Sequence, residues 1–229
     1  MPRTRPPGRL AALVEAATKV FVAHGYARAQ MDDVAEVLGV AKGTVYGYVT
    51  SKEALFALAV AFGDRPDELP SNDRLPLDLE DLPRPEEVIT DRLAAEVQDM
   101  QLVAVTQSPG ADAAAEVEEV ARDLLVRLAR NRVAIKLVDT CAADFPQLAD
   151  LWFGGGRWAQ VDLLTGYLRH QVDAGRLELS GDAAVIARTV IELCAMWAVH
   201  MPWDPAPRPL DQDHLLATVP RMVRGLVTG

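Results

Sequence analysis

Residues 25–55 read GYARAQMDDVAEVLGVAKGTVYGYVTSKEAL, and this stretch decides the fold. It predicts two short helices joined by a tight turn at Gly39–Ala41, the first with apolar residues at positions 31, 34, 35 and 38 on one face. A longer helix precedes them, with apolar residues at spacings of three and four from Leu10 onward, and His24-Gly25 ends it. A supporting helix followed by two short helices around a glycine-containing turn is the helix-turn-helix arrangement, whose second helix enters the DNA major groove.

The second short helix, expected over residues 42–49, has a distinct outward face. At 100° per residue, Val45 and Val49 share the inward face. The outward face and its edges are then formed by small, polar and aromatic residues: Lys42, Gly43, Thr44, Tyr46, Gly47 and Tyr48. No acidic residue occurs between Val40 and Ser51, as an approach to phosphates requires. The alternative is an ordinary surface helix weakened by its glycines.

Each of these residues has an expected role on DNA. Thr44 and Tyr46 are expected to reach base edges or a thymine methyl group. Lys42, Tyr48 and Lys52 are expected to contact phosphates and set the register of the helix. The two glycines allow the helix backbone a close approach to the groove. Arg3 and Arg5 are expected to form an arm that reaches neighbouring DNA, and Ser51 is expected to cap a fourth helix.

These residues carry a resemblance to a known family. The segment resembles the TetR-type family of bacterial transcriptional repressors, whose pattern is approximately GY..[TS][MV]..IA..AGVSKGT[LV]Y..F.[ST]K..L. The match covers about residues 9–58 without a gap. The sequence departs from the pattern at three positions. Gln30 stands where the family usually has a Thr or Ser that caps a helix and touches phosphate, Gly47 lacks the long polar side chain of many members, and Val49 replaces a Phe.

Charge is distributed unevenly along the 229 residues, which carry a formal net charge of −10. Residues 1–62 contain seven Lys or Arg and five Asp or Glu, whereas the remainder contains 16 basic and 28 acidic residues. The asymmetry indicates two parts with different partners. We therefore predict a DNA-binding domain over residues 1–62, with its helix-turn-helix at about 29–48, and a helical regulatory domain over 63–229.

The rest of the chain predicts an all-α fold with no repeat. Residues 63–87, rich in proline and acids, are expected to form a linker or an irregular connection. Helices are expected near 86–106, 111–143, 146–153, 157–174, 182–200 and 212–227. Breaks are expected at Ser108-Pro109-Gly110, Gly154-Gly155-Gly156, Gly175 and Pro202–Pro209, and Pro146 either starts a helix or kinks one.

Two of these helices predict an association with a second copy of the chain. In the 157–174 helix an apolar seam recurs at spacings of three and four: Trp158, Val161, Thr165, Leu168 and Val172. The 182–200 helix is apolar nearly all round, with Arg188 and Glu192 four residues apart and able to pair. Such a helix needs cover on both sides, so a four-helix interface of a homodimer is expected; packing within one chain is the alternative.

The resemblance also implies a small-molecule effector in the helical domain. Apolar and aromatic residues are candidates to line its pocket: Met100, Trp152, Phe153, Trp197, His200, Met201 and Trp203. The alternative is that the aromatic and methionine residues form plain core. His200 is the sharpest polar candidate, and it is equally consistent with a core or rim histidine.

Other site types find little support. The four histidines form no pair four residues apart, and neither a metal spacing, a phosphate-binding glycine loop nor a nucleophile elbow occurs. No cofactor, metal or membrane partner is therefore expected. No apolar run, Leu193–Val199 included, approaches the length of a bilayer span, and the N-terminal apolar stretch is interrupted by Glu15 and Lys19. Cys141 and Cys194 are expected to be buried thiols of a cytoplasmic protein, the alternative being a redox sensor.

Together these patterns predict a ligand-responsive transcriptional repressor, not an enzyme. A homodimer is expected to bind a palindromic double-stranded operator and to be released by a small molecule. The alternatives are a helical small-molecule carrier without DNA function and, with less support, an enzyme.

Overall fold

The computed structural model describes residues 8–228, which are helical apart from loops and two isolated β-bridges. Within this part of the chain no β-strand forms, and the all-α prediction is confirmed. The described residues belong to two compact units. Of the described residues, the first unit comprises 8–91 and Val133–Leu151, and the second comprises Arg92–Arg132 and 152–228. Arg3 and Arg5, the expected arm, lie outside the described residues.

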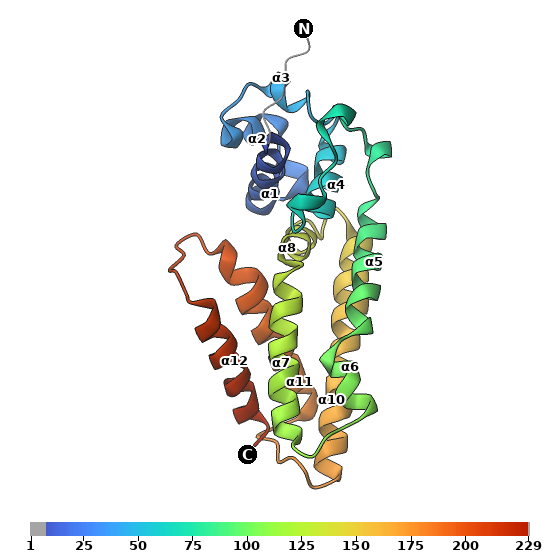
Figure 1. Cartoon of the computed structure of the whole chain (residues 1–229), viewed down its shortest axis with the longest axis vertical. Coiled ribbons are helices and arrows are strands. Elements are labelled where there is room, and N and C mark those ends of the chain that lie inside the picture. The colour runs from blue at the N-terminus through green and yellow to red at the C-terminus, as the bar shows by residue number, and fades with distance from the viewer. Residues whose placement is uncertain (1–7, 229) are drawn as a thin grey trace. The chain divides into compact units, whose positions relative to one another are not determined.

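The first unit is built on four N-terminal helices (Figure 1): α1 (Arg9–Arg28), α2 (Met31–Leu38), α3 (Lys42–Val45) and α4 (Lys52–Phe62). The apolar stripe predicted for the first helix is buried at every position: Leu10, Leu13, Val14, Ala17, Val20 and Phe21. Burial of this stripe against α2 and α4 stabilises the helix-turn-helix on its inner side. Gly25 has φ 71° and interrupts the helical geometry of α1, which confirms a glycine-dependent break there.

The acidic, proline-rich segment after α4 is ordered against the first unit. It contains three short 3₁₀ turns, at Pro66–Glu68, Asn72–Arg74 and Leu79–Asp81. Leu77 is fully buried, and its backbone N–H and C=O bond to Tyr48 O (2.8 Å) and Thr50 N (3.0 Å). The segment is irregular as predicted, but it packs on the helix-turn-helix.

Residues 133–151 also belong to the first unit. Helix α8 (Arg132–Thr140) begins where the Asp64 carboxylate accepts hydrogen bonds from Val133 N (2.8 Å) and Ala134 N (3.0 Å). The expected single helix over 111–143 is therefore wrong, because α7 ends at Ala129 and α8 starts anew with its free N–H groups capped by Asp64. Packing joins residues 63–91 and 133–151 to the N-terminal helices, while the functional boundary at residue 62 stays a prediction.

Helices of the second unit pack around α7 (Ala113–Ala129), which contacts α6 (Gln101–Gln107), α11 (Ala183–Ala195) and α12 (Gln212–Leu226). Helix α10 (Trp158–Asp173) packs on α6 and α11. Helix α5 (Pro85–Gln98) contains the boundary between the two units. The expected helix over 86–106 is split, because Met100 adopts extended geometry (φ −69°, ψ 124°) before α6.

Helix ends follow the local sequence at several positions and depart from it at one. Pro146 begins the short helix α9 (Pro146–Ala149), and Gly175 has φ 68° directly after α10. The break expected at Gly154–Gly156 is wrong, because a π-helical segment, Asp150–Arg157, runs continuously into α10. Its wider turn tolerates glycines that would weaken an isolated helix.

The stretch Ala183–Trp203 combines α11, the π-helical segment Met196–His200 and the 3₁₀ turn Met201–Trp203. It has 21 residues and a mean hydropathy of 1.5, so by length and composition it could cross a membrane. Arg188, Glu192 and His200 interrupt its apolar residues, so the uninterrupted apolar run in it is short, as expected. The stretch carries the predicted ion pair between Arg188 Nη2 and Glu192 Oε1 (2.6 Å) and packs on α7 and α10, as a core helix does.

Candidate nucleic-acid interface

Helices α2 and α3 form the predicted helix-turn-helix. Gly39 ends α2 in the left-handed conformation (φ 68°), which a residue with a Cβ adopts only at a cost. The next amide, Val40 N, donates to Ala35 O at 2.9 Å and closes the turn. Asp33 Oδ2 accepts from Gln30 N at 2.9 Å and so supports the start of α2, where Gln30 replaces the usual Thr or Ser.

Helix α3 is shorter than predicted. It covers Lys42–Val45 and continues as turns rather than as a regular helix to residue 49. Val45 and Val49 are nonetheless both fully buried, as their spacing predicted. Val49 also forms a bridge with Leu77, so the irregular segment supports the inner side of α3.

The outward face of α3 carries most of the residues expected there. Lys42, Gly43, Thr44 and Tyr46 are exposed, with Tyr46 at 41%. A Cβ at Gly43 would meet nothing within 4 Å, so the backbone there faces open space. Gly47 is half-buried, and Gln30 is exposed at the start of α2. Helix α3 lies at one end of the first unit (Figure 1), and the contacts of these residues with DNA stay predictions.

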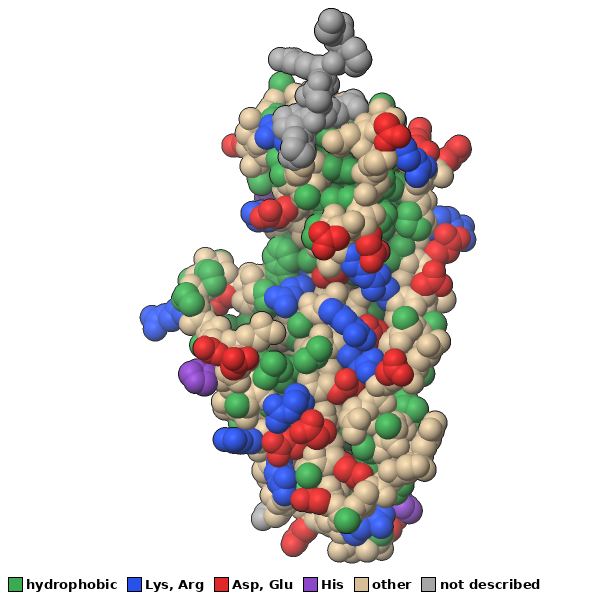
Figure 2. Space-filling view, in the orientation of Figure 1, with side chains coloured by type: hydrophobic (Ala, Val, Ile, Leu, Met, Phe, Trp, Pro, Cys, Tyr) green, Lys and Arg blue, Asp and Glu red, His purple; other side chains and the backbone are tan. Residues whose placement is uncertain are grey.

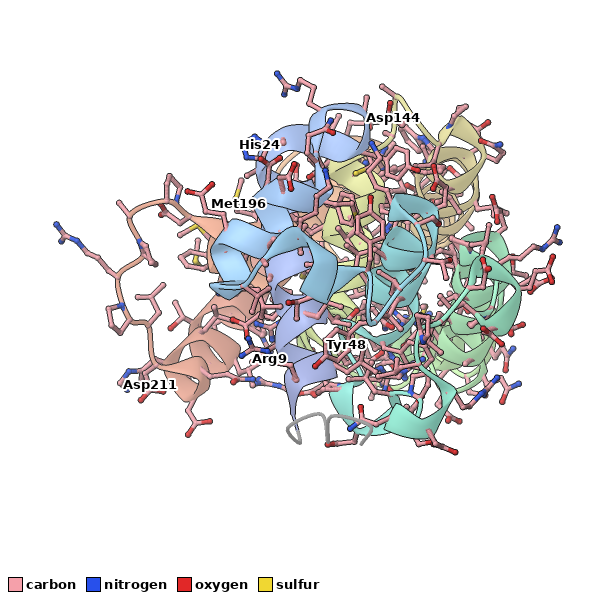
Figure 3. All side chains as sticks on the ribbon, turned by 90° about the horizontal axis from the view of Figure 1, so that it is seen from above. Arg9, His24, Tyr48, Asp144, Met196 and Asp211 are labelled. Atoms are coloured by element: carbon pink, nitrogen blue, oxygen red, sulfur yellow. The ribbon has the colours of Figure 1, made fainter. Side chains whose placement is uncertain are left out.

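Tyr48 lies elsewhere than predicted. Its side chain is 4% exposed, so its expected place at the edge of the outward face is wrong. The cause is the early end of α3: Tyr48 N bonds to Val45 O (2.9 Å), and Tyr48 O bonds to Leu77 N (2.8 Å). A helical wheel extended beyond Val45 places this ring incorrectly. Figure 3, which views the chain from above, labels Tyr48.

Lys42 remains accessible but has a partner. Its Nζ lies 2.9 Å from Asp32 Oδ2, and both side chains are at least half exposed. The hydrogen bond and charge of Asp32 raise the pKa of Lys42 above its ordinary value. Exposed pairs of this kind contribute little to stability, so a phosphate can exchange for Asp32 at small cost.

The Lys52 ammonium forms hydrogen bonds within the protein. Its Nζ donates to three backbone carbonyls at the end of α1: Tyr26 O (3.0 Å), Ala27 O (3.4 Å) and Ala29 O (3.2 Å). It also lies 4.4 Å from the centre of the Tyr26 ring, whose hydroxyl donates to Glu53 Oε1 at 2.9 Å. Because an ammonium has three N–H donors, these carbonyls occupy all of them. These contacts give Lys52 a structural role that the spacing of the motif does not reveal, and its phosphate contact stays a prediction.

We expect Lys52→Met to lower the free energy of unfolding by about 1–3 kcal/mol, because it leaves carbonyl groups without their partner. Urea denaturation measures this change, with Lys19→Met as the matched control. Lys19 pairs with Glu15 on an exposed face. A Lys52→Met protein of unchanged stability whose DNA affinity has a smaller salt dependence would instead support the phosphate contact.

An aromatic cluster joins the last turns of α1 to the middle of α4, and the sequence analysis did not predict it. Phe145 stacks on Phe56 (centroids 4.6 Å apart) and meets Tyr26 edge-on (4.7 Å). Asp144 also accepts from Ala27 N at 3.1 Å. Phe145 is distant in sequence from both partners, so no local pattern could have linked them.

Two of the seven residues predicted to line an effector pocket share one pocket, and the other five are not among the residues that line it. A pocket of about 490 Å³ in the second unit is lined by Trp197, with Met201 beside it, but not by Met100, Trp152, Phe153 or His200. Met100 and Trp152 are buried at 4% and 8% exposure, while Phe153 and His200 are half-buried. Met100 and Trp152 thus have the burial of plain core residues, and their role as ligand contacts stays a prediction.

Both cysteines are fully buried. Burial raises the pKa of Cys141 to about 11 and that of Cys194 to about 12, so both are protonated thiols at neutral pH. Within residues 8–228, no cluster of three His, Cys, Asp or Glu residues is placed to hold a metal ion.

Comparison with known proteins places the helix-turn-helix in a family. A sequence model described as "Bacterial regulatory proteins, tetR family" matches residues 13–59. No curated protein sequence matches the chain.

Solved structures of similar fold cover nearly the whole chain. The ketosteroid transcriptional regulator KstR2 of Mycobacterium tuberculosis is 14% identical, with a TM-score of 0.57, over 98% of this chain and 97% of that one. SCO3833 from Streptomyces coelicolor A3, a member of the TetR transcriptional regulator family, is 18% identical, with a TM-score of 0.55, over 100% and 92%. A tetR-family regulatory protein from Rhodococcus RHA1 is 18% identical, with a TM-score of 0.50, over 97% and 98%. At these identities the likeness establishes a shared fold.

Proposed function

We propose that the chain is a ligand-responsive repressor. By its N-terminal domain it belongs to the TetR family of bacterial regulatory proteins, which are DNA-binding transcriptional regulators. As a cytoplasmic homodimer it binds a palindromic operator through two copies of α3 and blocks transcription. A small molecule in the second unit releases it. The proposed activity is regulatory and not enzymatic.

The observation that carries the proposal is the exposed face of α3. Lys42, Gly43, Thr44 and Tyr46 are exposed on it, and no acidic residue lies between Val40 and Ser51 in a chain of net charge −10. Buried Val45 and Val49 fix this face from behind. A polar and aromatic face without acids suits base edges flanked by phosphates.

Exposed apolar residues on α10 and α11 support a dimer. Trp158 is 46% exposed and Val172 39% on α10, while Val185 is 65% exposed on α11 and Met196 is 49% exposed directly after it. Large apolar side chains left exposed along two packed helices are typical of a surface covered by a partner. A two-fold pair would present its recognition helices about 34–36 Å apart, to half-sites one helical turn from each other.

We expect Val185→Glu to raise the dimer dissociation constant by on the order of tenfold or more, since it places a charge in an apolar interface. Sedimentation velocity over a concentration series measures the constant. Met222→Glu is the control, because Met222 is similarly exposed (54%) but lies on α12. A wild-type protein that sediments as a monomer at all concentrations would count against the dimer.

The proposed function as a whole is tested by selecting DNA. The purified protein is mixed with fragments of bacterial genomic DNA, and the fragments it retains are sequenced. We expect one palindromic motif to be enriched and to lie at promoters, and its binding to weaken as salt rises. Retention without any common motif, or no retention in low salt, would contradict the proposal and leave the carrier as the better reading.

A further inference from the structure

The second unit contains a pocket of about 490 Å³, within the usual range for a small-molecule site. Its walls come from the end of α7, from the residues that follow α11, and from the start of α12. The apolar part includes Leu125, Trp197, Met201, Leu215 and Leu216. The connection between Trp203 and α12 stands out from the helices beside it, with Asp211 at its end (Figure 3). Figure 2 shows the surface hollowed next to this connection.

All charged side chains that line the pocket are positively charged. Three arginines contribute to it, Arg130, Arg132 and Arg208, and none of the described lining residues is Asp or Glu. In a chain with 33 acidic and 23 basic residues, such a lining is the reverse of the average surface. An apolar pocket whose charged side chains are all cationic favours a ligand that is apolar along most of its length and carries an anionic group.

The three arginines differ in the groups that their guanidinium nitrogens contact. Arg130 Nε donates to Glu96 Oε1 at 2.8 Å, so its charge is already matched within the protein. Arg132 Nε donates to the backbone oxygen Ala129 O at 2.8 Å, a neutral group. Arg208 lies on the exposed connection before α12. Among the described residues no carboxylate pairs with Arg132 or Arg208, which leaves these two guanidinium groups for an anion.

We propose that this pocket binds an amphipathic anion, a carboxylate or phosphate ester with a hydrophobic body. Arg132 and Arg208 hold the anionic group at the rim, and the hydrophobic body lies against Trp197, Met201 and Leu215. A cationic ligand would be repelled by the charges of Arg132 and Arg208, which no carboxylate matches, and a neutral apolar ligand would exclude water from these two groups without replacing it.

That this ligand is the effector of the repressor rests on the proposed function. Arg132 is followed in the chain by Val133 and Ala134, whose N–H groups donate to Asp64, two residues after the end of α4. A ligand that repositions Arg132 therefore acts on the residue that adjoins the anchored start of α8. Binding itself does not depend on this connection and is measured separately.

Isothermal titration of the full-length protein with dodecanoate, in the absence of DNA and below the concentration at which it aggregates, tests the pocket. Dodecan-1-ol and dodecylammonium are the neutral and cationic probes of equal chain length. We expect dodecanoate to bind tightest. Arg132→Gln and Arg208→Gln should each weaken it by on the order of tenfold, as loss of one charge-assisted hydrogen bond does.

Arg169→Gln is the matched control, since Arg169 is exposed on α10 outside the pocket, and we expect its affinity to equal that of wild type. Binding of dodecan-1-ol should not change in any variant. Equal affinity for the three probes, or dodecanoate binding that Arg132→Gln and Arg208→Gln leave unchanged, would overturn the proposal. Normal dodecanoate binding without release of operator DNA would instead count against the proposed function and leave the pocket assignment standing.

Discussion

Glu96→Ala is expected to lower the free energy of unfolding by about 3–5 kcal/mol, because it removes the centre of a buried ionic network. Glu96 accepts hydrogen bonds from Arg130 Nε (2.8 Å), Asn131 Nδ2 (2.8 Å) and Arg127 Nη1 (3.1 Å), and Arg130 Nη2 donates to it as well. Arg127 and Asn131 are only 9% and 1% exposed. Without Glu96, a buried guanidinium and a buried amide lose partners that water cannot fully replace.

Urea denaturation followed by circular dichroism measures this loss, with Glu87→Ala as the control. Glu87 pairs with Arg84 at 3.0 Å, but both side chains are more than half exposed. Its removal should change stability by less than about 1 kcal/mol. Similar effects of the two substitutions would show that the buried network contributes no more than a surface pair.

The network also gives a dependence on pH. Burial acts to raise the pKa of Glu96, but hydrogen bonds from Arg130 and Asn131 outweigh it and hold the pKa below its ordinary value. A depressed pKa in the folded protein contributes stability that is complete above the unfolded value and is lost as pH falls through the folded one. We therefore expect the difference in stability between wild type and Glu96→Ala to shrink in acid.

Thr44→Ala combined with Tyr46→Ala is expected to weaken specific operator binding by on the order of a hundredfold while the fold persists. Each exposed side chain is expected to contribute about 1–3 kcal/mol through a base contact. Tyr46 is 41% exposed and Thr44 is exposed, so neither contributes greatly to the core.

Fluorescence anisotropy with a labelled operator measures the loss. Leu79→Ala is the control, since Leu79 is a similarly exposed apolar residue (42%) of the first unit outside α2 and α3. We expect its operator affinity to match that of wild type. If the Thr44→Ala/Tyr46→Ala protein bound the operator with unchanged affinity, α3 would not be the element that recognises the DNA sequence.

Sequence patterns were sufficient wherever the determining contacts are local. The apolar stripe of α1, buried at every predicted position, follows from helical periodicity alone. Ser51 Oγ accepts from Ala54 N at 3.0 Å, as expected of an N-cap residue, and Asp182 caps α11 in the same way. The ion pair of Arg188 with Glu192 likewise needs only a spacing of four residues.

Sequence patterns failed where a distant segment decides the geometry. Tyr48 is buried because Leu77 pairs with its backbone, and nothing near Tyr48 in the sequence indicates that partner. Lys52 faces inward because the end of α1 presents three carbonyls to it. The long predicted helix over 111–143 divides because Asp64 supplies a new cap for α8. In each case a tertiary contact overrides the local preference.

The central claim is that the exposed, acid-free face of α3 reads a specific DNA sequence. The most direct measurement is an anisotropy titration of wild-type protein against the selected operator and against a shuffled duplex of equal composition, at several salt concentrations. The account predicts that the operator binds on the order of a thousandfold tighter or more, and that both affinities fall as salt rises. Equal affinity for the two duplexes would contradict it.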